Sequence, residues 1–77
     1  PMVKPAWLTL IVYCFKDLWN ADPERAYVML FKTRFHLSSE EVREILDISS
    51  SANVDQIFSR SVKFMRNAWS VREKNGL

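Results

Sequence analysis

The chain has 77 residues, 48% of them hydrophobic and 26% charged, and its single Cys14 and single His36 provide neither a disulfide nor a zinc site. Its only glycine is Gly76, which excludes the glycine-rich phosphate loops of nucleotide-binding enzymes. The formal net charge of +2 permits nucleic-acid binding without requiring it. We expect one domain, residues 1–77, without metal or cofactor.

The longest apolar stretch, Leu8 to Phe15, is far shorter than the roughly 20 residues of a membrane span. It also lacks the basic front and the cleavage site of a secretory signal. We therefore expect an intracellular protein without a membrane segment. Because a core of this size is marginally stable, a protein partner or a second copy is expected as well.

The first predicted helix runs from Pro5 to Trp19, and only Thr9, Lys16 and Asp17 interrupt its apolar residues. Such a helix is central or lies in an interface, and we expect it to be buried on most of its circumference. Its β-branched and aromatic residues also suit a strand, but no second alternating segment exists to pair with one. Three of its residues are the candidate contacts to a partner or a second copy: Trp7, Ile11 and Trp19.

Two further helices have clear start signals. Asp22 can cap a helix that begins with Pro23 and continues to about Phe35. Ser38 and Glu41 then form the capping-box pattern of a short helix, Ser39 to Asp47. The apolar stripe of this short helix is narrow and consists of Val42, Ile45 and Leu46.

The fourth predicted helix, from about Ala52 to Glu73, follows three serines that each offer a cap. At 100° per residue, one half of its circumference is apolar. That half contains Val54, Ile57, Phe58, Ser61, Val62, Phe64, Met65, Ala68, Trp69 and Val71. The other half is polar, and all its charges are positive: Gln56, Ser59, Arg60, Lys63, Arg66, Asn67, Ser70 and Lys74.

A short helix, a polar turn and a longer basic helix have the outline of a helix-turn-helix. The segment from Leu37 to Ile48 resembles the supporting helix of sigma factors and of the C-terminal domain of the DnaA family of replication initiators. The four predicted helices indicate an all-α, four-helix domain, and the likeness, which covers Arg25 to Met65, implies a helix-turn-helix architecture that binds DNA. The Arg-Asp-His signature of the DnaA family is absent at Ser49 to Asn53, and the glycine of sigma-type turns is absent too, so no family residues are carried over there.

We expect a non-enzymatic DNA-binding protein, a regulator of transcription or replication. The candidate contacts to DNA are Arg43, Gln56, Ser59, Arg60, Lys63, Arg66, Asn67 and Lys74. We expect Gln56, Ser59, Arg60, Lys63 and Asn67 to face the DNA, where Gln and Asn can pair with adenine and Arg with guanine, and we expect Arg43, Arg66 and Lys74 to hold phosphates. The simpler interpretation of the basic stripe is an ordinary solvated helix face.

The alternative function is a helical interaction or oligomerisation module that uses the apolar first helix and the acidic third helix. DNA binding requires Arg43 to share one continuous surface with Arg60, Lys63 and Arg66, whereas an interaction module leaves the acidic helix dominant. His36 has no catalytic or metal-binding neighbour in the sequence, and Cys14 lies in the most apolar segment. Neither residue predicts an active site.

Overall fold

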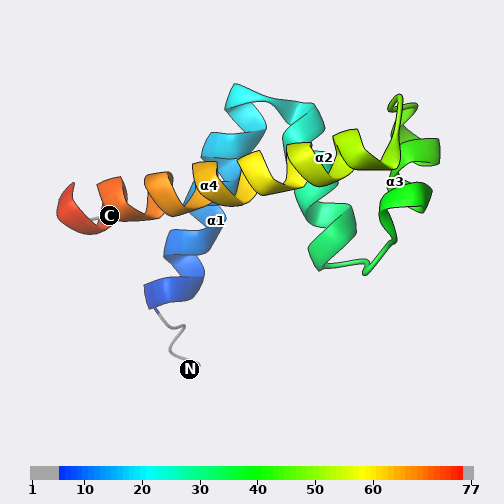
Figure 1. Cartoon of the computed structure of the whole chain (residues 1–77). Coiled ribbons are helices and arrows are strands. Elements are labelled where there is room, and N and C mark those ends of the chain that lie inside the picture. Colours follow the sequence, from blue (N-terminus) through cyan, green and yellow to red (C-terminus); the bar gives the residue numbers. More distant parts are fainter. Residues whose placement is uncertain (1–5, 76–77) are drawn as a thin grey trace, which may run out of the picture.

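The computed structural model describes residues 6–75 and forms an all-α domain. Its helices are α1 (Ala6–Ala21), α2 (Pro23–Thr33), α3 (Ser39–Leu46) and α4 (Ser51–Asn75). The described residues contain no strand, so the predicted fold class is confirmed. In Figure 1, α4 runs along the whole molecule, α1 and α2 cross it, and α3 lies beside its first turns.

The predicted helix starts are confirmed where a side chain caps them. The Asp22 carboxylate accepts hydrogen bonds from the backbone N–H groups of Glu24, at 3.1 Å, and Arg25, at 3.4 Å. The Ser38 hydroxyl accepts from the N–H of Glu41 at 3.1 Å, and the Glu41 carboxylate accepts from the N–H of Ser38 at 3.0 Å. These caps satisfy donors that have no partner within the helix.

Helix ends differ from their predicted positions by one or two residues. The predicted first residue, Pro5, lies outside the described part, and α1 continues beyond Trp19 to Ala21. The helix α2 stops before Phe35 because the chain reverses at His36, whose φ is 53°. Asp47 likewise lies beyond the end of α3, in the left-handed conformation.

Two clusters form the core. Val28, Val42, Ile48 and Val54 join α2, α3, the following turn and α4. Leu18, Ala26 and Met29 join α1 and α2, and Phe58 of α4 packs against both clusters. The fully buried Ser61 donates a hydrogen bond to the carbonyl oxygen of Ile57 at 2.7 Å, and its hydroxyl lies 3.3 Å from the carbonyl oxygen of Arg25. A small residue here lets α2 and α4 approach closely.

The prediction that the first helix is buried on most of its circumference is wrong. Only Leu10, Cys14 and Leu18 of α1 are buried. They lie one turn apart on the side covered by α2 and α4, and no third element covers the opposite side. The exposed large side chains of α1 are Trp7, Leu8, Ile11, Val12, Tyr13 and Trp19.

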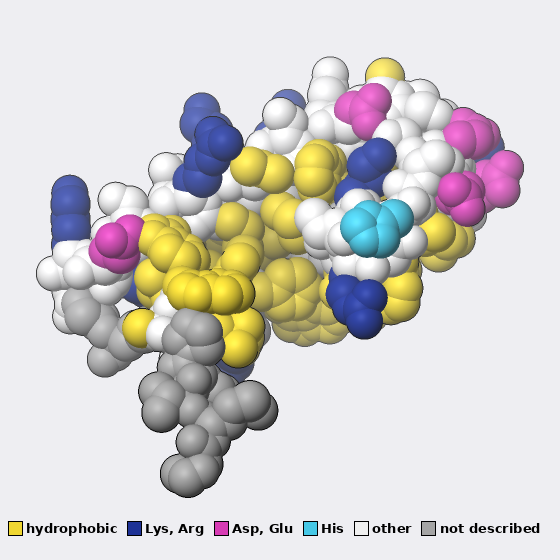
Figure 2. Space-filling model, turned by 90° about the horizontal axis from the view of Figure 1, so that it is seen from below, with side chains coloured by type: hydrophobic (Ala, Val, Ile, Leu, Met, Phe, Trp, Pro, Cys, Tyr) yellow, Lys and Arg dark blue, Asp and Glu magenta, His cyan; other side chains and the backbone are white. Residues whose placement is uncertain are grey.

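Two other predicted core residues are exposed. Ile45 of α3 is 58% exposed and Val71 of α4 is 57% exposed, because each lies toward an end of the molecule where its helix extends past its neighbours. Figure 2 shows that hydrophobic side chains spread without interruption over much of one face. Among residues 6–75, no helix is long and apolar enough to cross a membrane.

Candidate nucleic-acid interface

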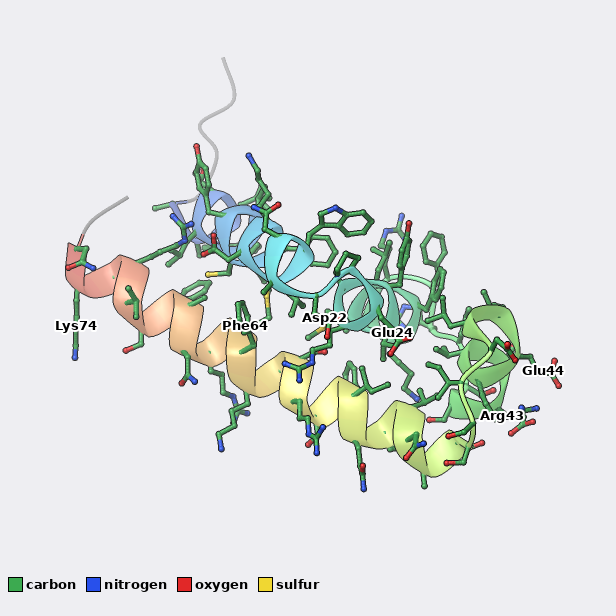
Figure 3. The ribbon with its side chains drawn as sticks, turned by 90° about the horizontal axis from the view of Figure 1, so that it is seen from above. Asp22, Glu24, Arg43, Glu44, Phe64 and Lys74 are labelled. Carbon is green, nitrogen blue, oxygen red and sulfur yellow. The ribbon has the colours of Figure 1, made fainter. Side chains whose placement is uncertain are left out.

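The outer face of α4 carries the polar residues that the helical periodicity predicts. Seven of the eight candidate DNA contacts lie on it, and all seven are exposed: Gln56, Ser59, Arg60, Lys63, Arg66, Asn67 and Lys74. We call this set the α4 polar face. Figure 3 shows the side chain of Lys74 pointing away from the other helices.

The four cations of the α4 polar face have no acidic partner within the described residues. Ion pairs there join Arg25 to Asp22, Arg43 to Glu40 and Glu44, and Arg72 to Asp17. None of them uses Arg60, Lys63, Arg66 or Lys74. At 1.5 Å per residue, these cations extend along roughly 21 Å of the helix. They are therefore available to an anionic ligand over that length.

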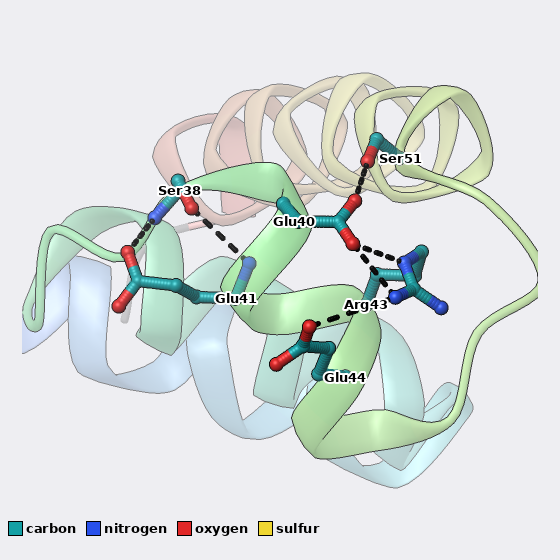
Figure 4. Close-up of polar contacts among 6 residues, drawn as sticks. All are labelled: Ser38, Glu40, Glu41, Arg43, Glu44 and Ser51. Atoms are coloured by element: carbon teal, nitrogen blue, oxygen red, sulfur yellow. Dashed lines mark hydrogen bonds and ion pairs between the residues drawn. The ribbon is translucent and has the colours of Figure 1, made fainter.

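Arg43, the eighth candidate, does not join this face. Its Nε and Nη2 atoms donate to the same Glu40 oxygen at 2.9 and 2.7 Å, and Nη2 lies 3.7 Å from Glu44 (Figure 4). It lies on α3, at the opposite end of the molecule from Lys74 (Figure 3). The expectation of one continuous surface that includes Arg43 is therefore wrong: its guanidinium is engaged by carboxylates of its own helix.

Glu40 joins α3 to the first turn of α4. Its second carboxylate oxygen accepts a hydrogen bond from the Ser51 hydroxyl at 2.6 Å (Figure 4). The hydrogen bonds from Arg43 and then from Ser51 lower the pKa of Glu40 from 4.5 to about 2. Glu40 is therefore ionised at neutral pH, and α3 is held against the start of α4 by a charge-assisted contact.

Ser39 makes a second connection between the same helices. Its hydroxyl donates to the Asp55 carboxylate of α4 and accepts from the Lys32 ammonium of α2 at 3.1 Å. Lys32 also lies over the ring of Phe58, 6.0 Å from its centroid. Three helices thus meet through polar contacts around Ser39, and this network keeps the first turns of α4 in place.

The turn between α3 and α4 has no glycine but reproduces a conformation that glycine favours. Asp47 adopts φ 54° and ψ 46°, a region that Asp tolerates better than most residues. Ile48 then enters the core, and Ser50 caps α4 by accepting from the N–H of Asn53 at 3.1 Å. The predicted serine cap is confirmed. The role of Asp47 was missed because its apolar neighbours continue the helical pattern.

Acidic side chains lie beside the first half of the α4 polar face. Gln56 and Arg60 border a polar hollow of about 340 Å³ together with Glu24 and Asp47. Within α3 itself, three acidic residues accompany the single Arg43. The positive charge of α4 is therefore least offset from Lys63 onward, where the helix carries four basic residues and one acidic residue.

The remaining titratable candidates do not form a reactive site. Cys14 is 1% exposed, and burial raises the pKa of its thiol, so little thiolate is present at neutral pH. His36 lies exposed in the connection between α2 and α3. Within residues 6–75, no three His, Cys, Asp or Glu side chains are grouped so that they could hold a metal ion.

Comparisons of the chain with protein-family models, curated proteins and solved structures found no match.

Proposed function

We propose that this protein binds double-stranded DNA without catalysing a reaction, as a helix-turn-helix regulator of transcription or replication that uses α3 and α4. One observation carries the proposal. The α4 polar face presents four cations without acidic partners, interleaved with amide and hydroxyl side chains. A merely soluble helix face usually mixes charges of both signs.

The residues of the α4 polar face have different proposed roles. The major groove is about 12 Å wide and admits one helix. Gln56 and Asn67 suit adenine, Arg60 suits guanine, and Ser59 and Lys63 can reach either bases or phosphates. Arg66 and Lys74 then hold phosphates. The resemblance to helix-turn-helix domains supports α3 as the bracing helix, with Glu40 and Ser39 fixing its position.

Arg43 has a different role in this proposal from the one its sequence position indicates. The proposed DNA contact uses the α4 polar face alone, without the continuous surface through Arg43 that the sequence led us to require. Its guanidinium holds Glu40 in the orientation that receives the Ser51 hydroxyl. It therefore positions α3 rather than contacting a phosphate.

The salt dependence of binding tests the proposal. A fluorescently labelled random duplex is titrated with the protein at several salt concentrations, and anisotropy gives the association constant. Neutralising three or four phosphates predicts a slope of log K against log salt of about −3. The double variant Arg66→Ala/Lys74→Ala should weaken binding and flatten the slope by about two units, one for each lost phosphate contact.

The matched control removes one arginine and one lysine elsewhere. Arg34, directly after α2, and Lys16 of α1 are exposed cations, so Arg34→Ala/Lys16→Ala has the same net charge as the test variant. Equal loss of affinity in both variants would show that only net charge matters. An absence of salt-dependent binding in the wild type would contradict DNA binding and would favour the alternative, a helical protein-interaction module.

A further inference from the structure

The uncovered side of α1 is a regular apolar stripe. Leu8, Val12, Phe15 and Trp19 follow one another at intervals of four, three and four residues, which places them along one side of the helix. Val12 is 52% exposed, and Leu8 and Trp19 are 37% and 38% exposed. We call these four residues the α1 stripe. Phe15 packs partly against the core and the Trp19 ring against Tyr27, and the rest of the stripe is open to solvent.

The apolar surface continues from the α1 stripe in two directions. On one side, Ile11 borders an open apolar groove of about 350 Å³ that is also lined by Met29, Val62, Met65, Arg66 and Trp69. On the other side, aromatic rings form a row from Phe15 through Trp19, Tyr27 and Phe31 to Phe35, with centroids 4.9–6.5 Å apart. Figure 2 shows this broad hydrophobic face.

The area of this face suits an interface between two chains. A large aromatic side chain buries about 150–250 Å², so the exposed parts of Trp19 and Tyr27, together with Leu8, Ile11 and Val12, amount to roughly 300–400 Å². A standard interface buries about 800 Å² per partner, little more than half of it apolar. The Cα atoms span only 16 Å in the thinnest direction, so a single copy has little interior in which to bury such side chains.

The charges around the α1 stripe indicate which partner covers it. Within α1 the only charged residues are Lys16 and Asp17, and Asp17 is engaged by Arg72. A strongly acidic or basic partner would therefore find little to pair with. A second copy of the same chain presents an equally uncharged stripe and meets no cluster of like charges.

We propose that the protein forms a two-fold symmetric dimer in which the α1 helices of two copies pack antiparallel along the α1 stripe. The spacing of the stripe is symmetric about a point between Tyr13 and Cys14. A two-fold axis there places Leu8 opposite Trp19 and Val12 opposite Phe15 of the second copy, so each contact occurs twice. This inference does not depend on DNA binding.

Sedimentation velocity without DNA tests the dimer. Between about 1 and 200 µM, a range suited to micromolar association, the wild type should change from one chain of 9.1 kDa toward the mass of two. In the dimer, Val12→Glu places two negative charges, one from each copy, beside the two-fold axis. This change should raise the dissociation constant of the dimer at least about tenfold. Asn20→Glu is the matched control, because it adds the same charge to an exposed α1 position off the stripe.

Circular dichroism of each variant checks that the helices are retained, and Leu8→Gln is the second test variant if Val12→Glu fails to fold. When Val12→Cys copies are mixed with Phe15→Cys copies, a disulfide between the two supports the antiparallel register, because these positions lie opposite each other; Asn20→Cys copies mixed with Phe15→Cys copies should form none. A wild type that remains monomeric across this range overturns the proposal. A dimer that is insensitive to both stripe variants overturns it as well, because the interface then lies elsewhere.

Discussion

Asp17 of α1 and Arg72 of α4 form a bidentate ion pair between the two helices. The Nε and Nη2 atoms of Arg72 donate to the two carboxylate oxygens of Asp17 at 2.9 and 2.7 Å, and its guanidinium lies 5.1 Å from the centre of the Tyr13 ring. These residues are 55 positions apart in the sequence. The pair connects the last turn of α4 to the second half of α1.

We expect Asp17→Asn to lower the melting temperature by about 2–5 °C at pH 7. The hydrogen bonds from Arg72 lower the pKa of Asp17 below 3.8, so its contribution to stability is present above that pH and is lost as the pH falls further. The difference in melting temperature between Asp17→Asn and wild type, measured by thermal unfolding, should therefore become smaller as the pH falls below 3.8. Asp47→Asn is the control, because the Asp47 carboxylate is exposed and has no ion pair in the described chain. Equal melting temperatures for Asp17→Asn and wild type at pH 7 would contradict this role.

We expect Glu40→Gln to destabilise the junction of α3 and α4 in a pH-dependent manner. The pKa of Glu40 is lowered from 4.5 to about 2, so its stabilising contribution is complete above pH 4.5 and disappears as the pH falls through about 2. The melting temperature of the variant should lie below that of the wild type at pH 7, and this difference should disappear as the pH falls from 4.5 to about 2. Glu44→Gln should behave like wild type, because the contact between Glu44 and Arg43 is long, at 3.7 Å, and the Glu44 side chain is largely exposed. A gap that is independent of pH would refute the assignment.

Two leucines of α1 provide a matched test of which side of the helix is buried. Leu10 is 7% exposed and Leu8 is 37% exposed. Leu10→Ala should cost about 2–5 kcal/mol of unfolding free energy in urea denaturation. Leu8→Ala, and Ile11→Ala at a position that is 40% exposed, should cost about 1 kcal/mol or less when measured on dilute monomer. Similar losses for Leu8 and Leu10 would mean that α1 is buried on both sides.

On DNA, Arg60→Ala and Lys74→Ala should have effects of different kinds. Arg60→Ala should cost about 1–3 kcal/mol of binding free energy on the preferred sequence and should relax the choice of base. Lys74→Ala should weaken binding to all duplexes alike and reduce the salt slope by about one unit. A selected duplex and a scrambled duplex, compared by anisotropy, separate the two outcomes. If Arg60→Ala weakens both duplexes equally, Arg60 contacts phosphate rather than a base.

Local features of this protein could be predicted from its sequence because they depend on neighbours along the chain. The caps at Asp22 and Ser38 use donors two or three residues away, and the exposure of the α4 polar face follows from a period of 3.6 residues. The helices themselves, and hence the all-α class, are decided at this level.

The tertiary structure decided the features that depend on how helices cross. Leu10 and Ile11 are both apolar and both belong to the nearly continuous apolar surface of the predicted first helix. Which of the two is buried depends on where the neighbouring helices pack. Arg43 pairs with Glu40 three residues away on the same helix, a local spacing, whereas the hydrogen bond from Ser51 to Glu40 crosses the turn and needs the folded chain. The Asp17–Arg72 pair depends on two helices that meet far apart in the chain. Propensity, periodicity and ion pairs three residues apart act over one or two helical turns, whereas the coverage of a helix and the ion pairs between helices are set by contacts between segments that only the folded chain brings together.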